Sequence, residues 1–413
     1  MIRCVHTYRS PLLAFRGATE LPDAATSPFD AAGVPWHYGD PLREQRLISR
    51  GGVVVDRSHR GVLRVTGPDA ATFLNNLLSQ KLDDVEPGFS AAALDLDMQG
   101  RILHHADVSL IDAAPTFYLD LPSYSLDSFR DFLTKMVFWS EVTVEEADLG
   151  ILTVLGAPSS FSPAEFLSGA GITAAFERTV PWSAARRIDV AVPRLDLAAA
   201  YKALTSPVEG PAGDSAGSSG AGTSAGLDRA GLMAFTAERI KALEPELRVD
   251  LDNKSIPHEA HTLIRRGENL GAVHLDKGCY RGQETVARVE NLGRSPRLLV
   301  LLHIDGSAPL DPKPGDPVTF GGRTVGHVGS IVHDCDYGPI ALALVKRSAL
   351  TQAIDTGAQL DVIASVRAES ADGDNEVVQE INVSATVDPD SMPKDEGERA
   401  GRVAVDKLRG RTN

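Results

Sequence analysis

The chain has 413 residues, which is long for one hydrophobic core and predicts two or three domains. Its net charge of −15, from 41 basic and 56 acidic residues, argues against nonspecific binding to nucleic acid or to anionic membranes. No run approaches the roughly 20 apolar residues that cross a bilayer, and the first residues lack the apolar core of a signal peptide, so we expect a cytoplasmic protein without a membrane partner.

The first part of the chain carries prolines and few periodic apolar positions, so we predict an N-terminal arm over residues 1–50. From Val53 onward, short apolar runs typical of strands alternate with stretches whose apolar residues recur every three or four positions, as in helices. Together they indicate a mixed α+β body over residues 51–296. The predicted strands are 53–55, 62–65, 117–121, 151–155 and 188–192, and the predicted helices are 68–78, 126–137 and 229–243.

Residues 205–230 are rich in Gly, Ala and Ser and cannot bury enough apolar surface to offset the entropy of ordering, so we predict a disordered insertion within the body. The helix after it carries Arg239 on an apolar face, where the side chain either snorkels outward or reaches a ligand. Short strands separated by Gly and Pro predict a compact antiparallel barrel or sandwich over residues 297–368. Residues 369–413 are predicted to form an acidic, partly disordered tail.

The most informative stretch is the octapeptide KGCYRGQE, from Lys277 to Glu284, which places a thiol, an ammonium, a phenol, an amide and a carboxylate around two glycines. Glycine adopts positive φ without a Cβ penalty, so Gly278 and Gly282 allow a tight turn or a close approach to a ligand. A cation beside a thiol favours the nucleophilic thiolate, which makes Cys279 and Lys277 candidates for chemistry. The alternative is a structural turn in which the cysteine is a small buried hydrophobe.

This octapeptide, continued by the residues up to Arg288, resembles the signature of the YgfZ-type folate-binding proteins. Those proteins are relatives of the glycine cleavage T-protein, an aminomethyltransferase, and act in the assembly or repair of iron-sulfur clusters. A weaker resemblance runs from about His37 to about Arg367 and covers most of the chain. The resemblance implies an α+β fold: a folate-binding body of two related α+β halves and a C-terminal antiparallel β-barrel, arranged around a central opening.

The resemblance also implies a ligand and partners. We expect tetrahydrofolate or a derivative as the cofactor, and iron-sulfur client or assembly proteins as partners. Recognition of the pterin ring calls for carboxylates or amides, and the glutamate tail of folate calls for arginines. The predicted cofactor-binding residues are Arg239, Glu259, Gly278, Tyr280, Gly282, Gln283, Glu284 and Arg288.

Three functions stay open at this point. The first is a folate-dependent accessory factor for iron-sulfur enzymes, the second a tetrahydrofolate-dependent aminomethyltransferase, and the third a binding module without chemistry. In the aminomethyltransferases a Gly-Gly-Ile-x-Asp-Asp segment supplies a carboxylate that handles a proton of tetrahydrofolate, and this chain has His104 and His105 in the corresponding place. That difference argues against aminomethyl transfer. The alternative for the two histidines is a strand pair with one ring inside and one outside.

Metal sites have little support in the sequence. The three cysteines form no CxxC pair, and the stretch from His258 to His261 is one residue short of the zinc motif HExxH. The run from His333 to Asp336 contains ligand-type side chains, but its neighbours Tyr337, Gly338 and Pro339 are typical of a hairpin turn. We therefore predict no metal.

Overall fold

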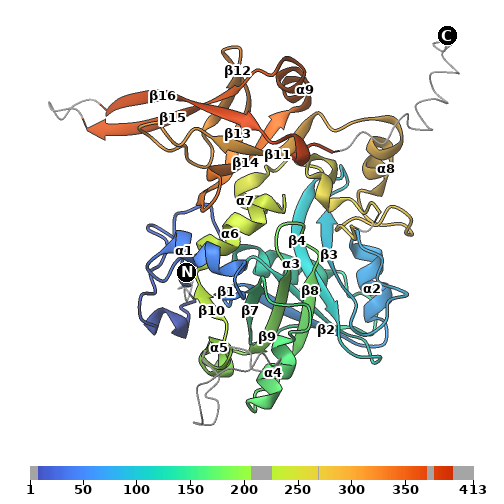
Figure 1. Ribbon diagram of the computed structural model, residues 1–413. Coiled ribbons are helices and arrows are strands. Elements are labelled where there is room, and N and C mark those ends of the chain that lie inside the picture. The colour runs from blue at the N-terminus through green and yellow to red at the C-terminus, as the bar shows by residue number, and fades with distance from the viewer. Residues whose placement is uncertain (1–7, 206–225, 268, 370–375, 394–413) are drawn as a thin grey trace, which may run out of the picture.

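The computed structural model describes residues 8–205, 226–267, 269–369 and 376–393, which form two five-stranded sheets and a closed barrel (Figure 1). This is the predicted α+β body with a C-terminal antiparallel β-barrel. Most of the predicted Gly/Ala/Ser-rich insertion, residues 206–225, and most of the predicted tail lie outside the described residues. Among the helices that are described, none is long and apolar enough to span a bilayer.

The first sheet, which we call sheet A, is antiparallel and has the strand order β3-β4-β5-β2-β6. Two helices pack on one of its faces and bury Phe73 and Phe129 against the strands. The elements are β2 (Gly61–Thr66), α2 (Ala70–Leu77), β3 (Ser90–Leu96), β4 (Ile102–Leu110), β5 (Thr116–Leu121), α3 (Leu126–Lys135) and β6 (Thr143–Glu146).

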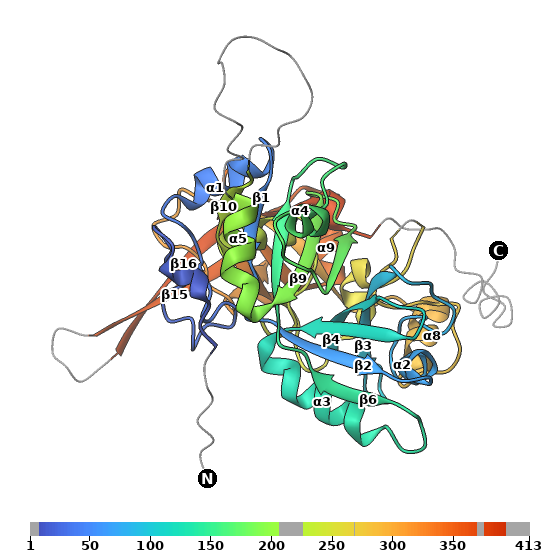
Figure 2. The same ribbon diagram turned by 90° about the horizontal axis from the view of Figure 1, so that it is seen from below.

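The second sheet, sheet B, has the order β10-β1-β7-β9-β8, and only the β10–β1 pair is parallel. Its helices α4 and α5 lie at the opposite end of the body from α3 (Figure 2). The chain passes from β1 in sheet B directly to β2 in sheet A, so residues 57–60 connect the two sheets. The elements are β1 (Val53–Asp56), β7 (Leu149–Leu155), α4 (Pro163–Gly169), β8 (Phe176–Val180), β9 (Arg187–Pro193), α5 (Leu197–Thr205) and β10 (Asp228–Ala230).

The barrel closes in the order β11-β14-β13-β12-β15-β16, with β16 returning to β11 through pairs such as Leu302 with Val387. It therefore extends past the predicted end at residue 368. In β16 the side chains of Val383 and Ala385 alternate into the barrel core, although acidic residues precede them in the sequence. The elements are β11 (Arg297–Ile304), β12 (Pro317–Phe320), β13 (Arg323–Asp334), β14 (Gly338–Lys346), α9 (Arg347–Thr356), β15 (Leu360–Glu369) and β16 (Glu376–Val387).

The described part of the predicted N-terminal arm packs against the body. Leu12 is fully buried, and Ser10 Oγ donates a hydrogen bond of 2.5 Å to Asp56 Oδ2 at the end of β1. The helix α1 (Pro41–Ile48) begins at Asp40, whose side chain accepts a hydrogen bond from the Arg43 amide. The remaining helices, α6 (Leu232–Lys241), α7 (Leu247–Asp250) and α8 (Gln283–Leu292), lie between the sheets and the barrel or beside them (Figure 1).

Candidate functional site

A buried cluster of charged side chains joins the two sheets. Arg178 of β8 and Arg187 of β9 each place Nη2 within 2.8 Å of the Asp189 carboxylate, at 2.8 and 2.7 Å. Arg60, in the link between the sheets, places Nε 2.7 Å from Asp120 Oδ2 of β5. Arg178 also contacts Asp120, so one arginine bridges sheet B to sheet A. The cluster fixes the relative position of the two sheets.

A cavity of about 440 Å³ lies next to this cluster, within the size range of small-molecule sites. Its walls come from β3, β4 and β8, from the end of α6, and from two loops that reach Thr262 and Ala272. Most of the lining is apolar. The polar groups that face the cavity include His105, Asp107, Arg178, Glu244 and Asn269.

A second, smaller cavity of about 50 Å³ shares three lining residues with the first, His105, Asp107 and Glu244. It is lined by several charged groups, among them Arg239 and Glu246. Burial raises the pKa of Glu246 to about 7, although Arg239 opposes the shift, so this carboxyl changes its charge near neutral pH. The three shared residues therefore lie at the junction between a cavity with mostly apolar walls and a smaller one lined by several charged groups.

Trp182 supplies a flat aromatic wall at this junction. Its Nε1 donates a hydrogen bond of 2.5 Å to Glu244 Oε2, and its ring centroid lies 5.1 Å from that of Phe235. The Arg187 guanidinium lies 4.8 Å from the Trp182 ring centroid on the protein side. An indole held in this way offers a fixed surface for a planar ligand.

The carboxylates of the junction stay ionised and its imidazole stays neutral. Burial acts to raise the pKa values of Asp107 and Glu244, but nearby cations, Arg178 for the first and Arg187 for the second, outweigh it and hold both below the usual range. Burial lowers the pKa of His105. Ionised carboxylates only accept hydrogen bonds, so this junction suits a ligand edge that carries several N–H donors.

The signature octapeptide lies elsewhere and anchors a turn. Lys277 Nζ donates to the main-chain carbonyls of Asn75, Leu78 (2.6 Å) and Gln80 (3.1 Å), which closes the C-terminal end of α2. Burial lowers the pKa of Lys277 to about 8, while the three carbonyls accept from its charged form. The same ammonium lies 4.9 Å from the ring centroid of the buried Tyr280. Lys277 therefore faces α2 and Tyr280.

The second half of the octapeptide packs on the turn between β3 and β4. Gly282 has φ +82°, as the sequence predicts for a tight turn, and a Cβ there would lie 2.6 Å from the Asp97 carbonyl oxygen. Gly278 has no positive φ and faces open space. Gln283 Nε2 donates to the Lys277 carbonyl oxygen at 3.2 Å. Cys279 is exposed, as are Glu284 and Arg288 on α8.

Of the ten predicted site residues, Arg239 is the only one that lines either of these two cavities. It is nearly buried and places Nη1 2.8 Å from Asp250 Oδ2. Glu259 is also buried, but both of its carboxylate oxygens accept hydrogen bonds of 2.8 Å from Arg297. The predicted residues thus occupy three separate places: the cavity wall, the Arg297 ion pair and the signature turn. Their functional roles stay predictions.

The fold is shared with a solved aminomethyltransferase. The crystal structure of the glycine cleavage system aminomethyltransferase T from Bartonella henselae superposes with a TM-score of 0.64 at 19% sequence identity, covering 90% of this chain and 94% of that one. No protein-family model matches the chain.

Sequence relatives come from two groups. An aminomethyltransferase of Streptomyces coelicolor is 27% identical over 345 residues, covering 78% of this chain and 86% of that protein. The mitochondrial iron-sulfur cluster assembly factor IBA57 of Homo sapiens is 27% identical over 333 residues, covering 74% of this chain and 82% of that protein. The chain is thus similar in sequence both to aminomethyltransferases and to iron-sulfur cluster assembly factors. The resemblance inferred from the signature is thereby confirmed.

The strand β4 carries His104 and His105, where the sequence comparison with aminomethyltransferases predicts an Asp-Asp pair. His105 lines both cavities, whereas His104 points to the other face of sheet A and contacts Ser128 and Phe129 of α3. One ring inside and one outside is the alternative that strand alternation predicts. Asp107, two residues after His105, lines the same cavities, so β4 places a carboxylate on the same face one alternation further along.

Asp107, Trp182 and Glu244 are not among the site residues predicted from the sequence. A signal for part of the site was nevertheless present, because Asp107, Asp120 and Asp189 each interrupt an apolar strand at an inward-facing position. Charged groups at such positions need partners, and they indicate a buried polar cluster.

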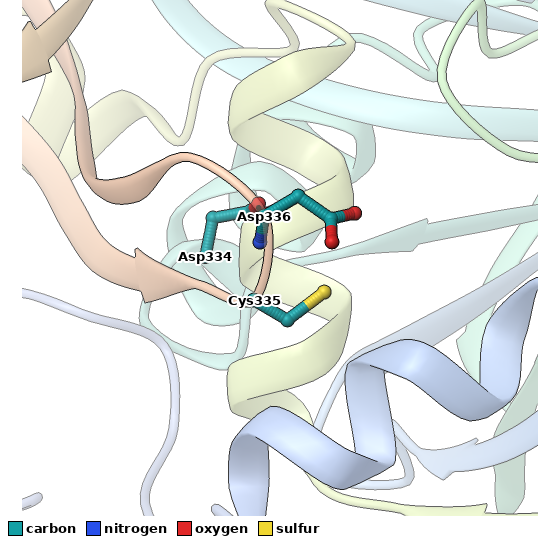
Figure 3. Close-up of side chains that lie close together, drawn as sticks. All are labelled: Asp334, Cys335 and Asp336. Atoms are coloured by element: carbon teal, nitrogen blue, oxygen red, sulfur yellow. Dashed lines mark hydrogen bonds between the residues drawn. The ribbon is translucent and has the colours of Figure 1, made fainter.

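The predicted hairpin from His333 to Asp336 is observed between β13 and β14, where Asp334, Cys335 and Asp336 gather at the turn (Figure 3). Oxygen and sulfur atoms of the three side chains lie within 4.8 Å of one another. Asp334 Oδ2 lies 3.0 Å from Lys241 Nζ, and Asp334 Oδ1 accepts from the amides of Asp336 and Tyr337. The Lys241 ammonium neutralises the buried Asp334 carboxylate, and the remaining hydrogen bonds of Asp334 are those of a hairpin turn.

Proposed function

We propose that this protein binds tetrahydrofolate or a derivative in the 440 Å³ cavity and acts as an accessory factor for the assembly or repair of iron-sulfur enzymes. The observation that carries the proposal is the junction of Trp182, Glu244 and Asp107 in a cavity with mostly apolar walls. A reduced pterin has a planar face for the indole and an edge of N–H donors for the two ionised carboxylates. The iron-sulfur part rests on the relatives that are assembly factors.

The cavity assignment predicts that Glu244→Gln weakens binding of tetrahydrofolate and 5-formyltetrahydrofolate by roughly ten- to a hundredfold, the range for loss of a hydrogen bond to a charged group. Binding is followed by tryptophan fluorescence in a Trp139→Phe background, which removes an almost fully exposed indole and leaves Trp36 and Trp182 as the emitters. Ligand stacked on Trp182 quenches its emission.

The matched control is Glu259→Gln, which alters another buried carboxylate that is paired with an arginine but lines neither of the two cavities. We expect this variant to bind folate as the parent does. If Glu259→Gln weakens binding and Glu244→Gln does not, the ligand lies near the Arg297 ion pair and the cavity assignment is wrong. No saturable binding by either folate would remove the cofactor from the proposal.

The thiol of Cys279 is proposed to serve the iron-sulfur role, because it is exposed on the signature turn and its sulfur is available to a partner. Cys279→Ser should abolish rescue of iron-sulfur enzyme activity in a strain that lacks the gene, while leaving folding and folate affinity unchanged. Cys335→Ser is the control, since that cysteine lies on the β13–β14 turn. Full rescue by Cys279→Ser would exclude the thiol from the function.

A further inference from the structure

A serine, a histidine and an aspartate form a hydrogen-bonded series on the face of sheet A that is turned away from the cavities. Ser128 Oγ lies 2.9 Å from His104 Nε2, and His104 Nδ1 lies 2.8 Å from Asp95 Oδ2. Asp95 is buried, His104 is nearly buried, and Ser128 is exposed at the first turn of α3. Ser128 is thus the most exposed member of the series.

Three elements hold this series in place independently. Asp95 of β3 and His104 of β4 are directly paired across the antiparallel strands. The His104 ring packs against Phe129, with 5.0 Å between ring centroids, and α3 supplies both Phe129 and Ser128. The imidazole is therefore fixed by a strand partner on one side and a helix on the other, which is the arrangement required for a positioned base.

The proton positions follow from the carboxylate. Arg281 donates to Asp95 Oδ1 and to the Leu96 carbonyl oxygen, so the Asp95 carboxyl accepts from Arg281 through one oxygen and faces His104 with the other. In the tautomer in which His104 Nδ1 donates to Asp95 Oδ2, Nε2 is the acceptor for the Ser128 hydroxyl. The hydroxyl has a second acceptor, the Ser125 carbonyl oxygen at 3.0 Å, and it turns from one to the other by rotation about a single bond.

We propose that Ser128 is a nucleophile for acyl transfer, with His104 as its general base and Asp95 as the group that orients the imidazole. This order of groups is that of the Ser-His-Asp triad, which recurs on unrelated folds. The substrate class is carboxylic esters and thioesters. The inference is independent of the proposed folate function, because none of the three residues lines either of the two cavities.

The step balances without a further reactant. Ser128 Oγ bonds to the acyl carbon as its proton passes to His104 Nε2, and the bond to the leaving alkoxide or thiolate breaks as that group takes the proton. Water then adds to the acyl-serine by the same route and releases the acid.

Arg281 gives the site a preference for anionic esters. Its guanidinium lies 4.6 Å from the ring centroid of Phe132, which is one helical turn after Ser128 on the same side of α3. The Arg281 side chain is 34% exposed, so its charge reaches the surface beside the serine. A substrate with a carboxylate near the ester carbonyl should therefore react faster than a neutral one, and the difference should shrink in high salt.

The test is covalent labelling of the purified full-length protein with a fluorophosphonate, followed by mass spectrometry of the labelled peptide. We expect Ser128 to be labelled, and Ser128→Ala to lose the label and the hydrolysis of 4-nitrophenyl acetate. Ser128→Ala should fold normally because Ser128 is an exposed residue. Ser123→Ala is the control, since Ser123 is an exposed serine five positions earlier whose hydroxyl donates to Asp30 at 2.8 Å and faces no imidazole.

The variant His104→Gln tests whether the reactivity of Ser128 depends on the imidazole or only on the exposure of the serine. It should lower the labelling rate of Ser128 by roughly a hundredfold, as expected for loss of a positioned general base. Circular dichroism and a melting curve establish that this variant is folded before its rate is compared. A failure of fluorophosphonate to label Ser128 in the parent protein, or an equal labelling rate in folded His104→Gln, would overturn the proposal.

Discussion

Replacing Asp189 with asparagine should lower the free energy of unfolding by about 3 to 5 kcal/mol, the range found when one member of a buried ion pair is removed. Asp189 is fully buried and accepts hydrogen bonds from Arg178, Arg187 and Thr153. The asparagine amide is nearly the same size but brings N–H groups against the two guanidinium groups. The loss therefore comes from uncompensated positive charge in the interior.

Urea or guanidinium unfolding followed by circular dichroism measures this loss. The control is Asp148→Asn, which removes an aspartate that is 84% exposed and lies 3.3 Å from Arg194. An exposed pair of this kind contributes less than about 1 kcal/mol. Equal losses for the two variants would mean that the buried cluster is not what holds sheet A to sheet B.

The loss of stability in Asp189→Asn, relative to the parent protein, should be smaller in acid than at neutral pH. Burial alone would raise the pKa of Asp189, but Arg187, Arg178 and Arg57 outweigh it and hold the pKa well below its usual range. Because the folded value is the lower one, the stabilisation is complete above the unfolded-state pKa of about 4 and is lost as pH falls through the folded value. The gap between parent and Asp189→Asn should stay constant from pH 6 down to about pH 4 and narrow below that. A gap that stays constant below about pH 4 as well would contradict the assignment.

Gly282→Ala should destabilise the protein by about 2 to 4 kcal/mol, through a left-handed backbone conformation and a steric clash together. The new Cβ would lie 2.6 Å from the Asp97 carbonyl oxygen and 3.0 Å from Gly100 Cα, both main-chain atoms that cannot rotate away. Thermal or denaturant unfolding measures the change.

Gly278→Ala in the same octapeptide is the matched control for Gly282→Ala. Gly278 has ordinary φ and no heavy atom near the position of a Cβ, so the substitution should change stability by less than about 0.5 kcal/mol. If both alanine variants unfold like the parent, the signature turn does not need the tight approach to the β3–β4 turn. If both are strongly destabilised, the strain at Gly282 is not the cause.

The sequence predicts the architecture better than the site because the two depend on different ranges of the chain. Apolar periodicity places strands such as β1 and β7 locally. The parallel partner of β1 is β10, whose Asp228 pairs with Val53 from far along the chain, and no local pattern indicates that pairing. The end of the barrel was missed for the same reason, since β16 is identified by its contact with β11.

The candidate site shows the same limit more strongly. A dense run of polar residues such as the signature octapeptide is visible in the sequence, yet Lys277 binds carbonyls of α2 and Arg281 binds the end of β3. The cavity junction instead combines Asp107, Trp182 and Glu244, which come from three separate segments. Their proximity results from the packing of sheets A and B, so it is not a property of any single motif.

The origin of the large cavity in many segments has a consequence for how the protein folds. Its lining extends from Ser90 to Ala272, and neither sheet alone provides a complete wall. The cavity is therefore complete only when sheets A and B and the loop that ends at Ala272 have docked. A fragment that stops before Thr262 would have no enclosed site. In the intact protein a bound ligand would contact both sheets and the loop, so it would stabilise them together and make them unfold as one unit.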